Sequence, residues 1–231
     1  MSPTKNAQAV EAMEPAALFS VMSKCFAPVD DADWAEISRF AVWSSFLEGA
    51  RTALQGEDAL SPREGRPGSR PLEDFLSAGE VEALFAPPTA GEKRAFAARR
   101  FTGGLPGSAL PVESLYTSWS RDDGTVFGRQ KGLYMGDSAR YMRDLIERMG
   151  FQVPAEYAAC PDHLALELDL LSVMLRSGMQ EQARQFLSER FEWLTAYRMR
   201  LLEIGEEARF WAGIVDVLMG LAAQQSSGSA R

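Results

Sequence analysis

The chain of 231 residues is long enough for one large domain or two smaller ones. Hydrophobic residues make up 46% and charged residues 24%, a globular composition that excludes disordered, collagenous and membrane-embedded classes. The formal net charge of -8 repels phosphate groups, so general nucleic-acid binding is disfavoured and a cationic peptide is a suitable partner.

The cysteines and the apolar segments indicate the cellular compartment in which the chain is expected. Cys25 and Cys160 are far apart and form no C-x-x-C pair, so we expect two reduced thiols and neither a disulfide framework nor a zinc knuckle. The first ten residues lack the apolar run of a signal peptide, and the apolar stretch 210–223 is too short to span a bilayer. We therefore expect a cytoplasmic protein without stable membrane insertion.

Helical periodicity dominates the first 101 residues. A first helix is expected over 7–27, ending before a proline, and Asp33 and Glu36 have the spacing of a capping box at the start of the next. That second helix is expected to bury one face made of apolar residues at three-and-four spacing, namely Phe40, Trp43, Leu47, Ala50 and Leu54. Residues 55–71, rich in Gly, Pro and charge, predict a mobile loop, and shorter helices are expected over 72–86 and 91–101.

The pattern breaks between residues 102 and 136, where glycine or proline recurs every few positions. This irregular segment also holds Glu113, Tyr116, Asp122 and Asp123, and carboxylates beside aromatic rings suit a basic or amphipathic peptide. In the alternative interpretation the aromatic rings only anchor the segment to its neighbours.

Helical signals return after residue 136. Asp137 or Ser138 is expected to be an N-cap and Gly150 a C-cap, and Pro161 is expected at the first position of a helix that ends at Gly178. Its apolar stripe is Leu164, Leu168, Leu171 and Leu175. One continuous helix over 180–204 and a last helix over 206–224 follow. The pattern predicts an all-α bundle of two halves, 1–101 and 137–225, joined by the connector 102–136, with a disordered tail at 226–231.

Several short motifs in the second half resemble one family. They are Ser114-Leu115-Tyr116, Gly124, Tyr141, Gly150-Phe151, Pro161-Asp162-His163-Leu164, Glu167-Leu168, Phe186-Leu187 and Trp193. This set is similar to the TorD/DmsD/NarJ family of cytoplasmic redox-enzyme maturation chaperones, although Ala158-Ala159-Cys160 and Arg190 depart from its pattern. The resemblance implies an all-helical, non-enzymatic chaperone. Its expected partner is the catalytic subunit of a molybdenum-cofactor oxidoreductase, often bound through a twin-arginine signal peptide.

The candidate site combines this resemblance with local chemistry. His163 and Glu167 are one helical turn apart, and Asp162 precedes them, so carboxylates here and in the connector could pair with guanidinium groups of a client. The alternative is that Asp162 and His163 only cap the helix and join it to the connector. The client-binding set is Glu113, Tyr116, Asp122, Asp123, Asp162, His163 and Glu167.

Other functions stay open in the sequence. His163 is the only histidine, so a hydrolytic or small-molecule-binding domain would have to use it, with Cys160 three residues earlier. No catalytic elbow, P-loop or full set of zinc ligands accompanies this pair, so no cofactor and no metal are expected. A permanently bound assembly subunit is the other alternative. As a chaperone, the chain is expected to act as a monomer or homodimer.

Overall fold

A computed structural model describes residues 11–55, 78–122 and 124–228 of the chain. Within these ranges it contains α1 (Pro15–Phe26), α2 (Asp31–Ile37), α3 (Phe40–Gln55), α4 (Ala78–Phe85), α5 (Ala90–Arg100), α6 (Asp137–Arg148), α7 (Leu164–Arg176), α8 (Gln180–Arg190), α9 (Leu194–Ile204) and α10 (Arg209–Gly228). Short 3-10 turns occur at η2 (Glu113–Leu115), η3 (Ala155–Tyr157) and η4 (Glu206–Ala208). The described residues form no strand beyond one isolated bridge, so the predicted all-α class is confirmed.

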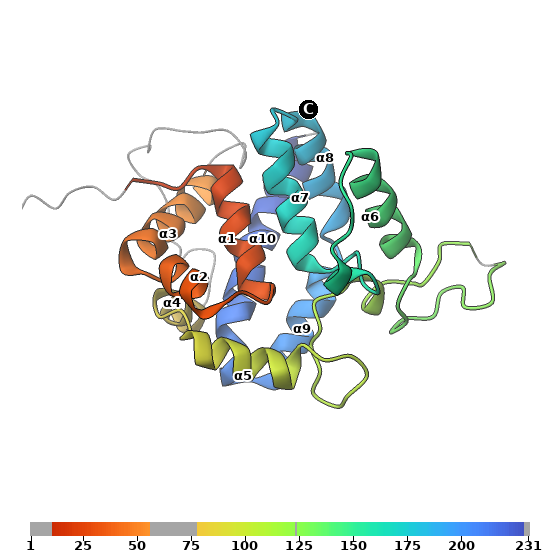
Figure 1. Cartoon of the computed structure of the whole chain (residues 1–231), viewed down its shortest axis with the longest axis horizontal. Helices are drawn as coiled ribbons and strands as arrows, with labels where there is room; N and C mark the ends of the chain where they lie inside the picture. Colours follow the sequence, from red (N-terminus) through yellow and green to blue (C-terminus); the bar gives the residue numbers. More distant parts are fainter. Residues whose placement is uncertain (1–10, 56–77, 123, 229–231) are drawn as a thin grey trace, which may run out of the picture.

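Two long helices, α7 and α10, organise the packing. α1 lies along α7, and α10 contacts α3, α4, α8 and α9 (Figure 1). One hydrophobic cluster therefore contains residues from both ends of the chain. None of the helices within the described ranges is long and apolar enough to cross a membrane.

The interface between α1 and α7 is apolar with two polar ties. The predicted stripe Leu164, Leu168, Leu171 and Leu175 is buried, as expected for the inner face of a central helix. Ser23 Oγ donates to the carbonyl of Ala165 at 2.8 Å, and Ser172 Oγ donates to that of Ala16 at 2.7 Å. These bonds fix the axial position of α1 on α7, because each joins a side chain to a buried main-chain oxygen.

The predicted long helix after residue 30 is two helices. Asp30 is the N-cap of α2 and accepts from Asp33 N at 2.8 Å, so the expected capping box of Asp33 and Glu36 is wrong. The chain breaks between α2 and α3 at Ser38, and Phe40, which begins α3, is 87% exposed rather than buried. A reciprocal capping box exists instead at α5, between Thr89 and Glu92.

Three further helix boundaries differ from the sequence prediction. Gly136 rather than Asp137 or Ser138 caps α6, and α7 begins at Leu164 with His163 as N-cap, so Pro161 is not its first residue. The expected helix 180–204 is divided into α8 and α9 because Phe191 and Trp193 turn inward at the junction, where both are buried.

Only some of the elements predicted near the two ends of the chain can be compared with the structure. α10 begins at residue 209 after η4 and continues to 228, so the first three residues of the expected tail are helical. The remainder of the tail, residues 7–10 of the first expected helix and most of the expected loop 55–71 lie outside the described residues.

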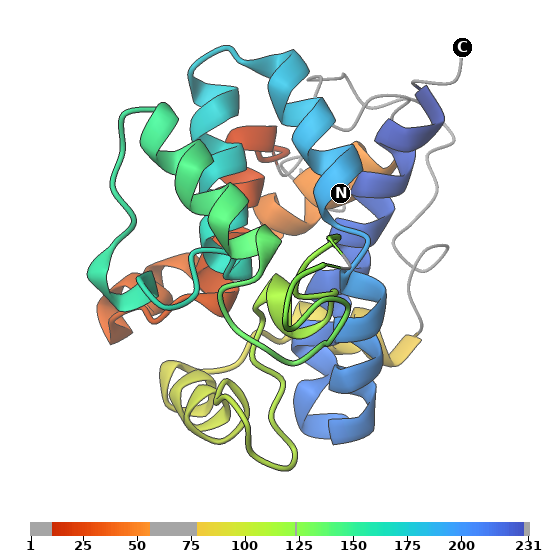
Figure 2. The ribbon, with the colours of Figure 1, turned by 90° about the vertical axis from the view of Figure 1, so that its right-hand side faces the viewer.

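The described part of the connector 102–136 contains no α-helix and only the turn η2. It faces the viewer in Figure 2. The middle of the connector is fixed to the start of α6, because the carboxylate of Asp137 accepts hydrogen bonds from Ser120 Oγ and Arg121 N, both at 2.9 Å. The irregular connector of the predicted fold is therefore present, while the division of the chain into two helical halves stays a prediction.

Candidate functional site

The connector is fixed to the start of α7 by the isolated antiparallel bridge between Val112 and His163. Glu113 N donates to the carbonyl of Asp162 at 3.0 Å, and Leu164 N donates to that of Pro111 at 2.8 Å. This pair of bonds places Glu113 beside Asp162 although the two are far apart in sequence.

His163 is a buried helix cap. Its Nδ1 accepts from Ala165 N at 3.1 Å, and its ring lies 5.0 Å from that of Tyr157. Burial lowers the pKa of His163 to about 3, because the charged imidazolium loses its hydration. The ring is therefore neutral at physiological pH and carries its proton on Nε2, since Nδ1 is the acceptor.

Three carboxyl groups gather behind this cap, from Glu113 on η2, Asp162 before α7 and Glu167 on α7. All three are buried, Asp162 and Glu167 with 0% exposure. Asp162 Oδ2 accepts from Ser114 N at 2.7 Å, and Glu113 is paired with Arg190 from the end of α8. Within the described ranges no three His, Cys, Asp or Glu side chains are arranged to hold a metal ion.

Burial raises the pKa of each of these carboxyls, that of Glu167 most strongly. Repulsion from Glu113 adds to the effect at Glu167, while Arg190 favours the ionised form of Glu113. The single guanidinium of Arg190 thus lies near three buried carboxyl groups. Protonation of Glu167 reduces the excess of negative charge among them.

A pocket of about 490 Å³ reaches the other side of His163. It lies between the α1–α2 link, α5 and the start of α7, and its apolar wall includes Phe26, Val29, Trp34, Phe101 and Leu110. Lys93 and Arg94 also line it. Lys93 is buried and donates to the carbonyl of Ala27, and Arg94 pairs with Asp31 at the surface. We call this the His163 pocket.

The structure brings four of the seven predicted site residues together, namely Glu113, Asp162, His163 and Glu167. Tyr116 follows η2 directly, but its ring stacks on Trp193 instead, with ring centroids 5.6 Å apart. Asp122 lies apart on an exposed bend, where its carboxylate accepts from Gly124 N at 2.8 Å, and Asp123 lies outside the described residues.

Two features of the site were not found in the sequence. The first is the role of Arg190 as the partner of Glu113, which joins positions 77 residues apart. The second is the His163 pocket itself. Its aromatic residues had the helical spacing of ordinary core positions, and no local pattern distinguishes a core residue from one beside a pocket.

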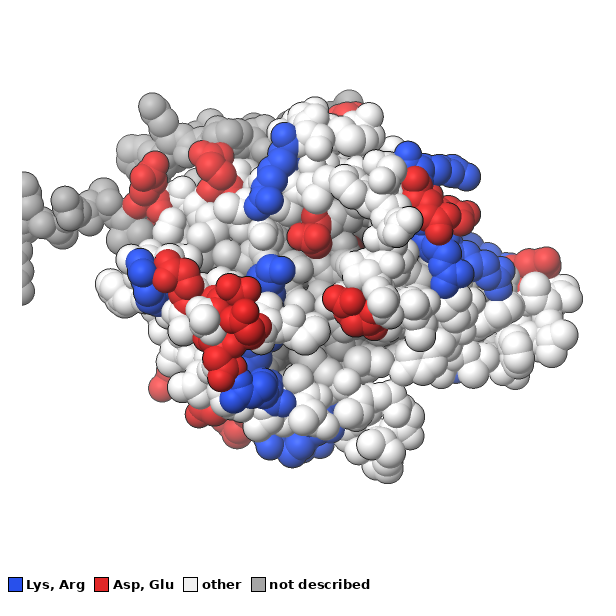
Figure 3. All heavy atoms as spheres, viewed as in Figure 1, with Lys and Arg blue, Asp and Glu red and all other residues white. Residues whose placement is uncertain are grey.

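Surface charge on the side shown in Figure 3 is divided between elements. Acidic side chains gather over α2, which has Asp30 as its N-cap and Asp31 and Asp33 in its first turn, and basic side chains gather over α5 and α6. The negative net charge is therefore not spread evenly over the molecule.

Comparison with known proteins agrees with the resemblance seen in the sequence. The family model described as nitrate reductase delta subunit matches residues 72–204. The chaperone protein TorD of Vibrio cholerae serotype O1 (strain ATCC 39315 / El Tor Inaba N16961) is 31% identical over 105 residues. That match covers 40% of this chain and 42% of the relative, so the chain spans less than half the length of this relative. The chain belongs to the family of the nitrate reductase delta subunit, which is the TorD/NarJ family.

Proposed function

We propose that the chain is a cytoplasmic chaperone for the catalytic subunit of a molybdenum-cofactor oxidoreductase. It holds a segment of that subunit, such as its twin-arginine signal peptide, until cofactor insertion is complete. Family membership supports this function, as does the name of the Vibrio cholerae relative.

The observation that carries the proposal is the His163 pocket. Its volume of about 490 Å³ is within the usual range for binding pockets, and its wall is largely apolar and aromatic. It opens beside α5 and reaches the Asp-His step that resembles the family motif. An apolar side chain of a client segment would therefore be removed from water next to His163.

The buried carboxyls have a positioning role in this proposal. Asp162 and Glu167 are fully buried, so they do not meet a client guanidinium in this arrangement of the chain. The bridge at Val112 and the cap at His163 instead hold the pocket wall in place. Lys93 at the wall also disfavours a cationic side chain inside this pocket.

The chemistry of the site supports binding rather than catalysis. Burial raises the pKa of Cys160 to about 11, which leaves little thiolate at neutral pH. The His163 ring uses Nδ1 to cap α7, so it is not free to act as a base through that atom. A hydrolase would lose turnover on His163→Ala, and a permanent subunit would remain in the mature complex; we expect neither.

The test is direct binding of a synthetic peptide in which two arginines precede a short run of leucine and alanine. Ala98 is exposed and lines the His163 pocket, so Ala98→Trp should block the pocket without disturbing the core. Ala35→Trp on α2, also exposed, is the matched control. We expect Ala98→Trp to weaken binding at least about tenfold in calorimetry, a change of about 1.4 kcal/mol, and Ala35→Trp to leave it unchanged. Equal affinity of the parent and Ala98→Trp would contradict the proposal.

A further inference from the structure

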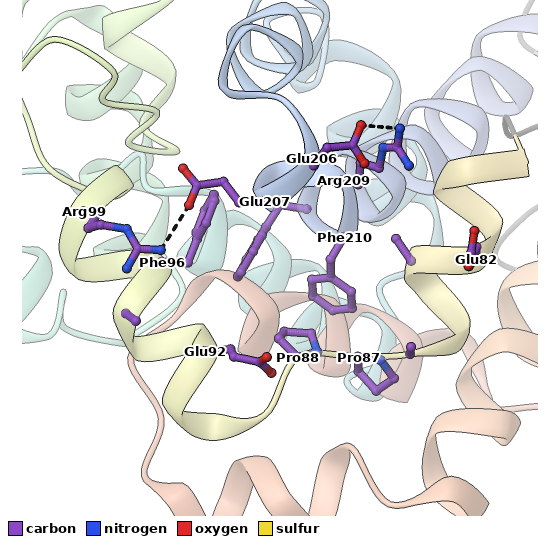
Figure 4. A pocket seen from close by; sticks show the side chains of 14 residues that line it. Glu82, Pro87, Pro88, Glu92, Phe96, Arg99, Glu206, Glu207, Arg209 and Phe210 are labelled. Carbon is purple, nitrogen blue, oxygen red and sulfur yellow. Dashed lines mark hydrogen bonds and ion pairs between the residues drawn. The ribbon is translucent and has the colours of Figure 1, made fainter.

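A second pocket, of about 790 Å³, lies on the opposite face of α5 from the His163 pocket. It is bounded by α4, α5, η4 and the start of α10 (Figure 4). Phe96 and Trp211 form its inner wall as a stacked pair with ring centroids 3.6 Å apart, and Phe210 and Pro88 lie beside them. We call it the acidic pocket, for the reason that follows.

Carboxylates outnumber cations on its lining. Two of its glutamates are paired with arginines: Glu207 with Arg99 at 3.0 Å and with Arg100, which does not line the pocket, and Glu206 with Arg209 (Figure 4). Glu82 and Glu92 remain, both exposed. Hydrogen bonds from Thr89 lower the pKa of Glu92, so this carboxylate stays ionised at neutral pH. Among the residues that line the acidic pocket, carboxylates thus exceed arginines by two, beside aromatic and proline surfaces.

The two pockets share α5 as a common wall and differ in charge. Glu92, Ala95, Phe96 and Arg99 face the acidic pocket. The His163 pocket is instead lined by the α5 residues Ala90, Lys93, Arg94, Ala97 and Ala98. The α5 wall of the acidic pocket and the α5 wall of the His163 pocket, which carries Lys93 and Arg94, are therefore opposite faces of one helix.

The solvent-exposed surface of α5 that separates the two pockets, which we call the ridge, carries small side chains. Gly91, Ala95 and Ala98 are exposed, and a Cβ added at Gly91 would meet no atom within 4 Å. A helix with its side chains is about 10 Å across, and an extended chain spans about 3.3 Å per residue. About three residues of an extended peptide would thus cross the ridge from one pocket to the other.

We propose that the acidic pocket binds the arginine side chains of the same client segment whose apolar stretch enters the His163 pocket. This inference rests on the proposed function and adds a second subsite with a fixed direction. A guanidinium can form bidentate bonds with a carboxylate and stack on aromatic and proline surfaces, and Glu82, Glu92, Phe210 and Pro88 offer both. The segment lies across α5, with its basic part towards α10 and its apolar part towards α1.

The experiment compares two tryptophan substitutions at exposed alanines of the same helix, Ala95→Trp in the acidic pocket and Ala98→Trp in the His163 pocket. The probes are a peptide with two arginines, a spacer of about three glycine and serine residues and a leucine-alanine run, and its analogue with both arginines replaced by glutamine. We expect the parent to bind the arginine peptide about tenfold more tightly than the glutamine analogue. Ala95→Trp should remove that difference and leave binding of the analogue unchanged, whereas Ala98→Trp should weaken both.

The outcomes separate the two proposals. If Ala98→Trp weakens binding while Ala95→Trp retains the preference for arginine, the acidic pocket is not the arginine subsite and the proposed function stands. If Ala98→Trp binds both peptides like the parent, the His163 pocket is not used and the proposed function fails. Glu82→Lys provides a test by charge alone, because Glu82 is exposed and its replacement does not alter the core. It should weaken the arginine peptide only, with a smaller effect at high salt, and an unchanged preference for arginine would overturn the inference.

Discussion

Glu167 and Glu113 are two buried carboxyl groups that act on each other electrostatically in the interior between α7 and η2. No N–H group of the described residues reaches either oxygen of Glu167, while Glu113 is also paired with Arg190. Burial and the charge of Glu113 both raise the pKa of Glu167. Arg190 therefore favours the charged form of Glu113, whereas burial and the charge of Glu113 favour the neutral form of Glu167.

This asymmetry predicts opposite results for the same substitution. Glu167→Gln keeps the donor and the shape, so the variant should be at least as stable as the parent at pH 7. Glu113→Gln leaves Arg190 largely buried without its carboxylate and should cost about 3 to 5 kcal/mol. Chemical denaturation at pH 7 measures both.

The pH dependence checks the same assignment. The pKa of Glu167 is higher in the folded protein than in the unfolded chain, where it is about 4.3. Its contribution to the free energy of unfolding is therefore complete below pH 4.3 and is lost as the pH rises towards the folded-state pKa. Stability of Glu167→Gln should therefore fall less than that of the parent between pH 4.3 and 8. Parallel curves for the two proteins would show that Glu167 does not hold the proton.

His163 predicts the opposite dependence at acid pH. Its folded pKa of about 3 lies below the unfolded value of about 6.5, so its contribution is present above pH 6.5 and is lost as pH falls through 3. The full effect is up to about 5 kcal/mol. His163→Asn retains a side chain that can cap α7 but does not titrate. Its stability should decline less between pH 6.5 and 4 than that of the parent, as measured by urea unfolding; an identical decline would place the acid sensitivity elsewhere.

The central interface should be far more sensitive than the exposed aromatic residue that begins α3. Leu168 is fully buried on α7, so Leu168→Ala should cost about 2 to 5 kcal/mol through lost contacts and a cavity. Phe40 is 87% exposed, so Phe40→Ala should change stability by no more than about 0.5 kcal/mol. Thermal unfolding of the two variants compares a residue whose burial was predicted correctly with one for which the prediction was wrong.

Two glycines should respond in opposite directions to alanine. A Cβ at Gly136 would lie 2.6 Å from the carbonyl oxygen of Trp119, which also accepts from Asp137 N, so Gly136→Ala should cost about 1 to 3 kcal/mol. Gly91 is helical and unobstructed, and Gly91→Ala should add about 0.5 to 1 kcal/mol. Differential scanning calorimetry would contradict the close approach at Gly136 if both variants melted above the parent.

The sequence predicted most helices because their periodicity is local. The stripe on α7 follows from three-and-four spacing, and the connector from its glycines. The break between α8 and α9 did not follow, because Phe191 fits the apolar face of one continuous helix. Trp193, two residues later, would lie on the opposite side of such a helix, and both rings are buried through contacts with Tyr116 and Phe186. Tertiary contacts overrode local propensity at this point.

The sequence indicated which of the candidate residues lie together better than it indicated their burial. The Asp162-His163 step and Glu113 do meet, but their burial depends on the bridge at Val112 and on Arg190, neither of which has a local signal. The expectation of carboxylates exposed to a client came from residue types, their spacing and the family resemblance, and none of these distinguishes an interior carboxyl from one at the surface.

The packing of α1 on α7 also has a consequence for biosynthesis. The bond from Ser23 to Ala165 joins positions 142 residues apart, so the side of α1 that packs on α7 has no partner until α7 has been made, although α3 is made earlier. At translation rates of about 5 to 20 residues per second, this interval lasts from about 7 to about 28 s. During that time the nascent chain presents Phe19 and Met22, both fully buried in the folded protein, to other molecules in the cell.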